Sequence, residues 1–238
     1  MKPFAGQLAL VTGASRGIGA ASAEALAAAG AHVVLTARDT KALEAVEERI
    51  HAAGGQATIA PLDLTEPDGI ARLAHAISQR WQALDILVIS AAVLPQLSSV
   101  ADIDAKALGT AMTVNVLATQ ALLAAFDPML RKSTDARVVG MTSNVARTPR
   151  AYWGAYAASK AAFEVLLECY AQETMNIAKV RVAMISPGAT RTAMRARAYP
   201  GEDPASVKPP EVVAKRLVSL LGEQFASGWR ESVNHSGS

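Results

Sequence analysis

The sequence has very little cysteine: Cys169 is the one cysteine among 238 residues. One thiol can form neither an internal disulfide nor a zinc cluster, which agrees with a reducing compartment. We expect Cys169 to be a small apolar side chain on a helix. No ligand spacing relates the four histidines, and we predict no metal site from them: His32, His51, His75 and His235.

Long apolar runs are also missing. The longest, ILVISAAVL, has roughly half the length that a membrane-spanning helix needs. The first residues, MKPFAGQLALVTGAS, contain one lysine, a short apolar stretch and no small-residue cleavage site, unlike a signal peptide. We therefore expect a cytoplasmic protein with no membrane partner.

Charged residues are few, at 18% of the chain, and the net charge is only +2. Because the lysines and arginines are scattered, no basic stripe is available to neutralise a nucleic-acid backbone, and we expect no nucleic-acid partner. Hydrophobic residues make up 51% of the chain, which suits a buried parallel sheet and argues against disorder. The length fits one α/β domain spanning residues 1–238.

Short runs rich in Val, Leu and Ile alternate with longer Ala-rich segments that have helical spacing. This alternation is typical of parallel strands joined by crossover helices. It predicts a Rossmann-type, doubly wound α/β fold in three layers, with a mostly parallel seven-stranded sheet. The predicted strands are Leu8–Thr12, His32–Ala37, Ala57–Leu62, Ile86–Ala91, Arg137–Met141, Val180–Ile185 and Glu231–Asn234.

Glycines and capping residues indicate where helices begin and end. In T-E-P-D, Thr65 supplies an N-cap hydroxyl, followed by a proline and an acid in the first turn, so a helix is predicted to begin there. The other predicted helices are Gly17–Ala29, Thr40–Ala53, Lys106–Arg131, Ala155–Asn176 and Glu211–Leu221.

Prolines interrupt the pattern beyond Pro187. We interpret residues 188–210 as a substrate lid, because long connections inside compact domains are usually functional or disordered. A passive surface loop is the alternative.

The first predicted strand leads directly into TGASRGIG, with a helix behind it. Gly13, Gly17 and Gly19 allow a tight turn that lies against a pyrophosphate without room for a β-carbon. The helix N-terminus then offers free N–H groups and a positive dipole to phosphates. Strand, glycines and helix together predict a dinucleotide site.

The end of the second predicted strand indicates which dinucleotide. NAD-binding proteins usually place an acid there for the ribose hydroxyls, whereas a 2′-phosphate needs a cation. This chain has Thr36 and Ala37 followed by Arg38, and Arg16 can converge on the same phosphate. NADP(H) is therefore predicted in preference to NAD(H). Asp39 is the one competing acid, and the alternative is that it caps the next helix.

Tyr156 and Lys160 lie four residues apart in YAASK, on one face of a predicted helix. A nearby ammonium stabilises a phenolate and lowers the phenol pKa, which suits acid/base chemistry. Ser143 follows a strand, where its hydroxyl can bind a reacting oxygen. Asn115 is a polar amide within an apolar run, so it must find partners once buried.

With these pieces the sequence resembles the short-chain dehydrogenase/reductase family over essentially its whole length. The resemblance implies that Tyr156 is the general acid/base and that Ser143 orients the substrate oxygen. It implies that Lys160 holds the nicotinamide ribose and that Asn115 anchors a water in the proton relay. Asp63 would meet the adenine, with Thr192 near the nicotinamide amide.

The resemblance also implies which residues surround the cofactor. WGAYAASK and TRTAMRARAYPGEDP are further similar to the YciK-like branch of the family. The predicted cofactor-binding residues are Gly13, Ser15, Arg16, Gly17, Ile18, Gly19, Arg38, Asp63, Leu64, Ala91, Tyr156, Lys160, Pro187, Gly188, Thr190 and Thr192.

One segment departs from the family pattern. Where the family usually has N-N-A-G, this chain has Ile89, Ser90, Ala91 and Ala92. The replacement is expected to remove a polar tie between strands and to narrow the wall beside the cofactor.

Several arginines cluster near the predicted site and lid, so an anionic substrate such as an acyl thioester is conceivable, with solvated surface arginines as the alternative. Trp153 and Tyr199 either wall the pocket or pack helix against lid. The arginines are Arg147, Arg150, Arg191, Arg195 and Arg197.

The sequence thus predicts an NADP(H)-dependent oxidoreductase that reduces a small-molecule carbonyl, a ketone or 3-oxoacyl-like compound, to an alcohol. An NAD-dependent alcohol dehydrogenase is the enzymatic alternative, and a nucleotide-binding sensor or assembly subunit with little turnover is the other. The apolar faces of helices 106–131 and 155–176 exceed what one sheet face needs, which predicts a homodimer or homotetramer.

Overall fold

The structure, a computed structural model, describes residues 2–233. Their strands form one parallel sheet in the order β3-β2-β1-β4-β5-β6-β7. The predicted seven-stranded Rossmann-type sheet is confirmed. The strands are β1 (Leu8–Thr12), β2 (His32–Thr36), β3 (Gln56–Ile59), β4 (Ile86–Ile89), β5 (Ala136–Met141), β6 (Val180–Ser186) and β7 (Trp229–Ser232).

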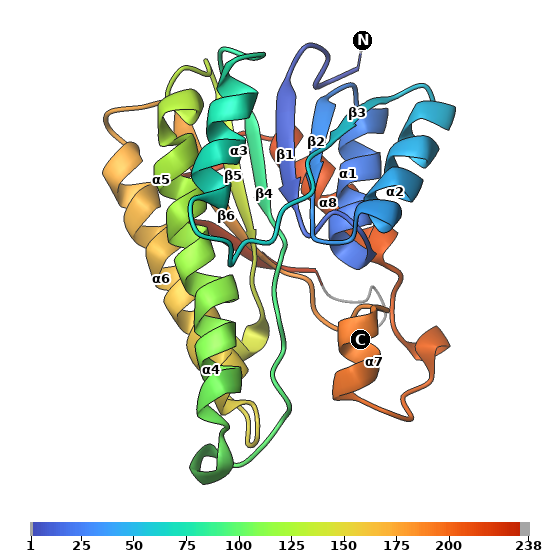
Figure 1. Cartoon of the computed structure of the whole chain (residues 1–238), viewed down its shortest axis with the longest axis vertical. Coiled ribbons are helices and arrows are strands. Elements are labelled where there is room, and N and C mark those ends of the chain that lie inside the picture. The colour runs from blue at the N-terminus through green and yellow to red at the C-terminus, as the bar shows by residue number, and fades with distance from the viewer. Residues whose placement is uncertain (1, 234–238) are drawn as a thin grey trace.

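Helices cover both faces of this sheet (Figure 1). Strand β1 has no polar face because alternate side chains enter two different cores: Ala9 and Val11 pack on one side, Leu8 and Leu10 on the other. The first core is closed by α1 (Gly17–Ala28), α2 (Thr40–Ala52) and α8 (Pro210–Gly222), and the second by α3 (Gly69–Ser78), α5 (Ala118–Leu130) and α6 (Gly154–Thr174).

Helix α3 begins at Gly69, so the prediction that it begins at Thr65 is wrong. The Thr65 hydroxyl donates to Asp63 Oδ1 at 2.8 Å, and its backbone N–H donates to the same oxygen at 2.9 Å. Asp68 has a left-handed backbone, with φ of 56°. Residues 65–68 therefore form a turn, and the hydroxyl that looked like a helix cap closes that turn instead.

The helix predicted at Lys106–Arg131 is made of α4 (Ala105–Met112), a π-helical turn η2 (Thr113–Leu117) and α5. Residues Ala105–Leu130 are long and apolar enough to cross a membrane, with a mean hydropathy of 1.4, so the expectation that no segment reaches that length is wrong. Leu122, Phe126 and Leu130 are fully buried against the sheet. Of the apolar stretch, 39% is buried inside the structure, and the α5 part packs into the core.

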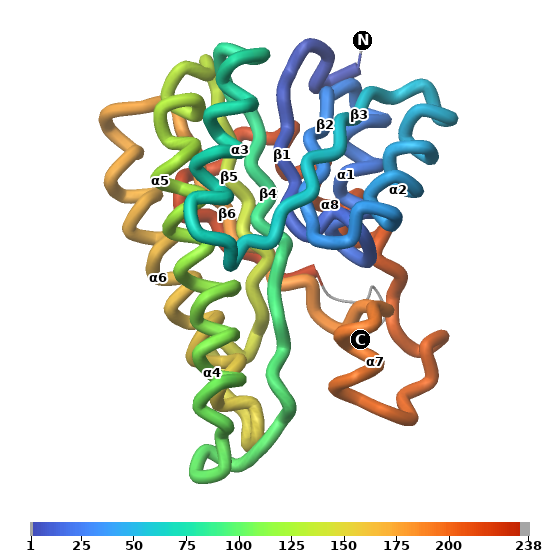
Figure 2. The backbone as a smooth tube through the Cα atoms, in the orientation of Figure 1, coloured from blue at the N-terminus to red at the C-terminus, as the bar shows by residue number. Residues whose placement is uncertain are grey.

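Two long connections leave the carboxyl ends of the strands, one after β4 and one after β6 (Figure 2). The second contains α7 (Ala193–Ala198). Two contacts join the beginning of this connection to its end: Thr190 pairs with Lys208 as a β-bridge, and Lys208 Nζ donates to the Ala189 carbonyl at 2.8 Å. Strand β7 lies two residues earlier than predicted, and Asn234 is outside the described residues.

Candidate active site

The glycine loop packs directly against the chain that leaves β4. Gly13 has a φ of +68°, and a β-carbon there would lie 2.8 Å from the Ala91 Cα. At Gly19 a β-carbon would lie 2.1 Å from the Gly13 carbonyl oxygen, so helix α1 can start this close to the loop only with glycine. Gly17 faces Thr192, whose Cγ2 would be 3.4 Å from a β-carbon. The glycine loop therefore meets two segments that are far from it in the sequence, the one after β4 and the one after β6.

Thr12 makes a polar contact between β1 and the chain that leaves β4. Its Oγ1 accepts hydrogen bonds from the backbone N–H groups of Ser90 and Ala91, both at 3.1 Å. Ile89 is buried and pairs with Thr12 and Gly140 in the sheet. The replacement of the family's asparagine does not leave these two N–H groups without a partner, because the Thr12 hydroxyl accepts from both. These bonds also explain why β4 ends at Ile89 and not at the predicted Ala91.

The end of β2 carries no free carboxylate. Asp39 caps α2, accepting from the Ala42 N–H at 3.1 Å, so the alternative reading of this acid is confirmed. Arg38 is exposed, and its guanidinium lies 4.0 Å from Asp63. Hydrogen bonds from Thr65, and more weakly the Arg38 charge, hold the pKa of Asp63 below its usual range.

Arg16 is the N-cap residue of α1, with an extended backbone and an exposed side chain. Within residues 2–233, the buried hydroxyl of Thr36 at the end of β2 has no hydrogen-bond partner. A buried hydroxyl without a partner is uncommon in a folded protein. Thr36 is the last residue of β2, so its hydroxyl lies at the carboxyl end of the sheet, where the predicted cofactor-binding residues also lie.

The other predicted cofactor residues belong to the same edge. Thr190 is buried, and its hydroxyl donates to the Pro187 carbonyl at 3.0 Å. Ile18 and Leu64 pack partly against the two hydrophobic cores. Ser15 and Gly188 are half-buried, one in the glycine loop and one just after β6.

Asn115 lies in the π-helical turn and is buried. Its Oδ1 accepts from the Val93 N–H at 2.9 Å, and its Nδ2 donates to the Val93 carbonyl at 3.0 Å and to Ser159 Oγ at 2.9 Å. The Ser159 hydroxyl in turn donates to the Tyr156 carbonyl at 2.8 Å. Asn115 therefore ties the connection after β4 to helix α6, one turn from Tyr156.

Lys160 is 2% exposed, and its Nζ donates to the Met141 carbonyl at 2.8 Å. The same ammonium lies 4.3 Å from the centre of the Phe163 ring. Because Met141 stands two residues before Ser143, this bond attaches helix α6 to the strand end that carries the predicted serine.

Tyr156 is 8% exposed and packs with Val145, two residues beyond Ser143. Ser143 starts a 3₁₀ turn, and its Oγ accepts a long bond of 3.5 Å from the Val145 N–H. Among the described residues, no hydrogen bond joins the Tyr156 hydroxyl to Ser143 or Lys160. The structure places Tyr156 beside the segment of Ser143, but within the described residues their side chains do not hydrogen-bond to one another.

Burial dominates the titration of the two helix residues. It raises the pKa of Tyr156 above its usual range. It lowers the pKa of Lys160 to about 8, and the Glu164 charge opposes that shift. The expectation that Lys160 lowers the pKa of Tyr156 is therefore wrong here, because desolvation disfavours the phenolate and the ammonium turns to a carbonyl.

The excursion after β6 lies over Tyr156. Met194 from α7 packs against the apolar cluster that contains Tyr156 and Trp153. The Trp153 ring is 5.9 Å from the Tyr199 ring and 6.0 Å from the Tyr156 ring. The two aromatic residues that sequence reasoning singled out thus join helix to excursion beside the phenol.

Three of the five predicted arginines have protein partners. Arg147 Nε donates to Glu164 at 2.8 Å, and Arg195 Nε donates to Glu202 at 2.7 Å. Arg197 donates to the Leu94 carbonyl, across to the connection after β4. These contacts hold the site's own loops, which weakens the case for an anion-binding cluster.

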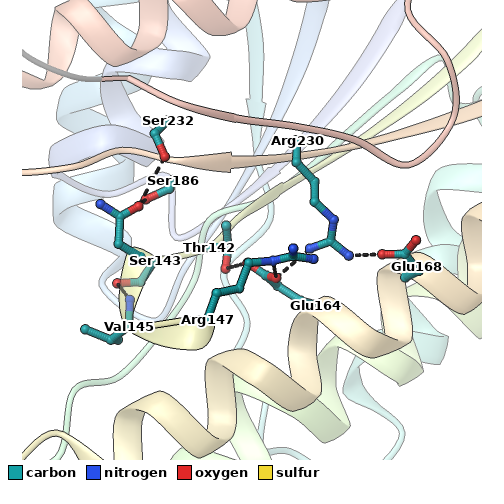
Figure 3. A network of polar contacts seen from close by, with 10 residues as sticks. Thr142, Ser143, Val145, Arg147, Glu164, Glu168, Ser186, Arg230 and Ser232 are labelled. Carbon is teal, nitrogen blue, oxygen red and sulfur yellow. Dashed lines mark hydrogen bonds and ion pairs between the residues drawn. The ribbon is translucent and has the colours of Figure 1, made fainter. Parts of the chain in front are cut away.

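Sequence reasoning missed Thr12 and Glu164. Glu164 is a buried carboxylate that binds Thr142, Arg147 and Arg230 (Figure 3). Its place one helical turn beyond Lys160, on the same face, is the signal that could have found it.

Comparison with known proteins agrees with this geometry. The short chain dehydrogenase family profile matches residues 7–203. The Escherichia coli K12 protein described as the uncharacterized oxidoreductase YciK is 37% identical over 220 residues, which cover 91% of this chain and 86% of that protein.

Solved structures are equally similar. A short chain dehydrogenase of Shigella flexneri 2a, complexed with NADP, has a TM-score of 0.93 and 35% identity over 97% of this chain and 98% of that one. One from E. coli CFT073, complexed with NADPH, has a TM-score of 0.92 and 36% identity, with the same coverage. With this fold, this site and these relatives, the chain belongs to the short chain dehydrogenase family and is an oxidoreductase of that family, similar to YciK.

Proposed function

We propose that this oxidoreductase uses NADPH to reduce the carbonyl of a small molecule to an alcohol. The relatives complexed with NADP and NADPH support the choice of cofactor. So does the end of β2, where Asp39 is engaged in capping and Arg38 is exposed. A 2′-phosphate would meet a cation there and no free carboxylate.

The residues present fit a dinucleotide. Gly13 and Gly19 provide a backbone surface that a β-carbon would block, and the N-terminus of α1 follows it. The unpartnered Thr36 hydroxyl offers a hydrogen bond at the adenosine end. We assign Arg16 and Arg38 to the 2′-phosphate and Lys160 to the nicotinamide ribose. When bound, NADPH supplies a hydride.

Tyr156 would donate the proton. A phenol is protonated at neutral pH, so Tyr156 holds the proton that reduction of a carbonyl consumes. Ser143 would hold the substrate oxygen by its hydroxyl.

The excursion 188–210 would act as the substrate lid. Met194 and Tyr199 lie against the aromatic and aliphatic side chains around Tyr156, so the part of the substrate next to the carbonyl would meet an apolar surface. The cytoplasm, where NADPH is abundant, remains the proposed location.

One observation carries the proposal. Tyr156 and Lys160 are buried four residues apart on α6, and Lys160 binds the end of the strand that leads to Ser143. The test is NADPH oxidation with a panel of ketones and 3-oxoacyl thioesters, and with NADH for comparison. Tyr156→Phe should lower kcat by about 100-fold or more while NADPH affinity stays within about twofold.

Tyr170→Phe is the matched control, because Tyr170 is on the same helix and its hydroxyl binds Asp127, which has no place in the proposed site. It should keep full turnover. A wild-type protein that binds NADPH but reduces no carbonyl would instead favour a nucleotide-binding sensor or assembly subunit. Faster turnover with NADH would favour an NAD-dependent dehydrogenase.

A further inference from the structure

Two side chains of helix α6 form hydrogen bonds with two consecutive residues at the end of β5. Lys160 Nζ donates to the Met141 carbonyl at 2.8 Å. One turn further along the helix, Glu164 Oε1 accepts from the Thr142 hydroxyl at 2.6 Å. The next residue in the chain is Ser143. The strand end that carries the serine is thus attached to the helix that carries Tyr156 immediately before the reacting group.

Glu164 also holds the segment that follows the serine. Its side chain is 8% exposed, and Oε2 accepts from Arg147 Nε at 2.8 Å. Arg230 of β7 donates to the same oxygen and also to Glu168 (Figure 3). One carboxylate therefore binds residues on both sides of Ser143, and a strand at the sheet edge.

Open space adjoins this carboxylate and the segment around Ser143. A cavity of about 550 Å³ lies beside it, lined by Ser143, Arg147, Glu164 and Arg230 among others. Within its turn, the Ser143 Oγ accepts the long 3.5 Å bond from Val145, and the Ser143 carbonyl accepts from the Ala146 N–H at 3.0 Å. Contacts to β6 and β7 hold Thr142 and Asn144, and the two bonds to Glu164 are those that attach residues on both sides of Ser143 to helix α6.

We propose that Glu164 is a positioning residue, which holds Thr142 and Arg147 so that the Ser143 hydroxyl stays aligned with Tyr156. The inference rests on the proposed carbonyl reduction, since it says how one of its groups is kept in place. A small displacement of a reacting group costs much in rate and little in ground-state binding.

Thr142 provides the sharpest test, because its hydroxyl can be removed while Glu164 keeps both arginines. Thr142→Val has nearly the same shape and no donor, and Thr142→Ser restores the donor. Glu168→Gln is the matched control: it removes a carboxylate that also binds Arg230 but does not contact Thr142. All three are compared with the wild type by steady-state kinetics, NADPH titration and thermal unfolding.

Thr142→Val should lower kcat about tenfold, with the substrate KM and the NADPH Kd within about twofold. Thr142→Ser should recover most of that loss, and Glu168→Gln should turn over like the wild type. Equal kcat in Thr142→Val and Thr142→Ser would overturn the proposal. A kcat loss matched by an equal loss of NADPH affinity and a lower Tm would do so as well, since it indicates general damage.

Backbone hydrogen exchange separates this inference from the proposed function. The Ala146 and Arg147 N–H groups bind the Ser143 and Asn144 carbonyls, and they should exchange faster in Thr142→Val and not in Thr142→Ser. A wild type without turnover would refute the carbonyl reduction alone. Unchanged exchange in Thr142→Val would refute the role of Glu164 whatever the activity.

Discussion

The Thr12 hydroxyl accepts the backbone N–H of Ala91 at 3.1 Å and so joins the ends of β1 and β4. It does the same for the Ser90 N–H, and thereby satisfies two donors that leave the sheet ladder. Thr12 thus serves two backbone donors where the ends of the two central strands lie side by side.

Thr12→Val should therefore lower the free energy of unfolding by about 2 kcal/mol, because it leaves two N–H groups unsatisfied in a half-buried place. Urea denaturation measures the change. Thr12→Ser, which keeps the oxygen, should lose much less. If both variants unfold alike, the Thr12 hydroxyl does not stabilise the fold through these hydrogen bonds.

Gly13→Ala should weaken NADPH binding by about tenfold or more, because the new β-carbon would meet the Ala91 backbone at 2.8 Å and shift the loop. Gly54→Ala is a matched control. Gly54 also has a positive φ, +75°, but nothing lies within 4 Å of a β-carbon there. Both variants share a backbone strain of about 1 kcal/mol, and only the first should change the Kd, measured by fluorescence titration.

Arg38→Ala should raise the Kd for NADPH about tenfold and leave the Kd for NADH unchanged, since it removes one charged contact to the 2′-phosphate at an exposed site. Arg72→Ala serves as control: Arg72 is also exposed and pairs with Glu66 on the far side of the turn. A parallel loss of NADH affinity in Arg38→Ala would contradict the assignment of Arg38 to the 2′-phosphate.

The buried Lys160 should make stability depend on pH. Its pKa is about 8 in the folded protein against an ordinary 10.5, so between these values the unfolded chain binds more protons and the free energy of unfolding rises with pH. From pH 8 to pH 10 the gain should be about 2 kcal/mol. Above that, the raised pKa of Tyr156 acts in the opposite direction, because the folded phenol keeps its proton.

Lys160→Met isolates this contribution. Denaturation curves of the variant and the wild type are measured from pH 7 to pH 10. As the pH rises, the free energy of unfolding of the wild type should increase relative to that of the variant. Parallel pH profiles would mean that Lys160 is as easily protonated in the folded protein as in the unfolded chain.

The helices on one face should also carry an oligomer contact. Leu117 is 60% exposed on η2 and Val165 is 61% exposed on α6, large apolar side chains that a monomer leaves in water. Changing both to Lys should convert a dimer or tetramer to a smaller species in light scattering. Val212→Lys, on α8, is the control at another exposed apolar position. An unchanged mass with the double variant would place the contact elsewhere.

The sequence by itself determined the sheet and most of the candidate site. A strand buried on both faces is a local apolar run, so β1 and its neighbours could be located within a few residues. The glycine spacing and the four-residue interval between Tyr156 and Lys160 are also local, because they follow from the geometry of one loop and one helix.

What only the tertiary structure decided depends on groups that are far apart in the chain. Thr12 meets Ala91 because parallel strands align their carboxyl ends, and Glu164 meets Thr142 because α6 packs on β5. The pKa of Tyr156 is raised because burial desolvates the phenol, and the amount of burial is a property of packing. Local patterns name the candidate reacting groups, whereas the three-dimensional contacts determine how those groups are held and charged.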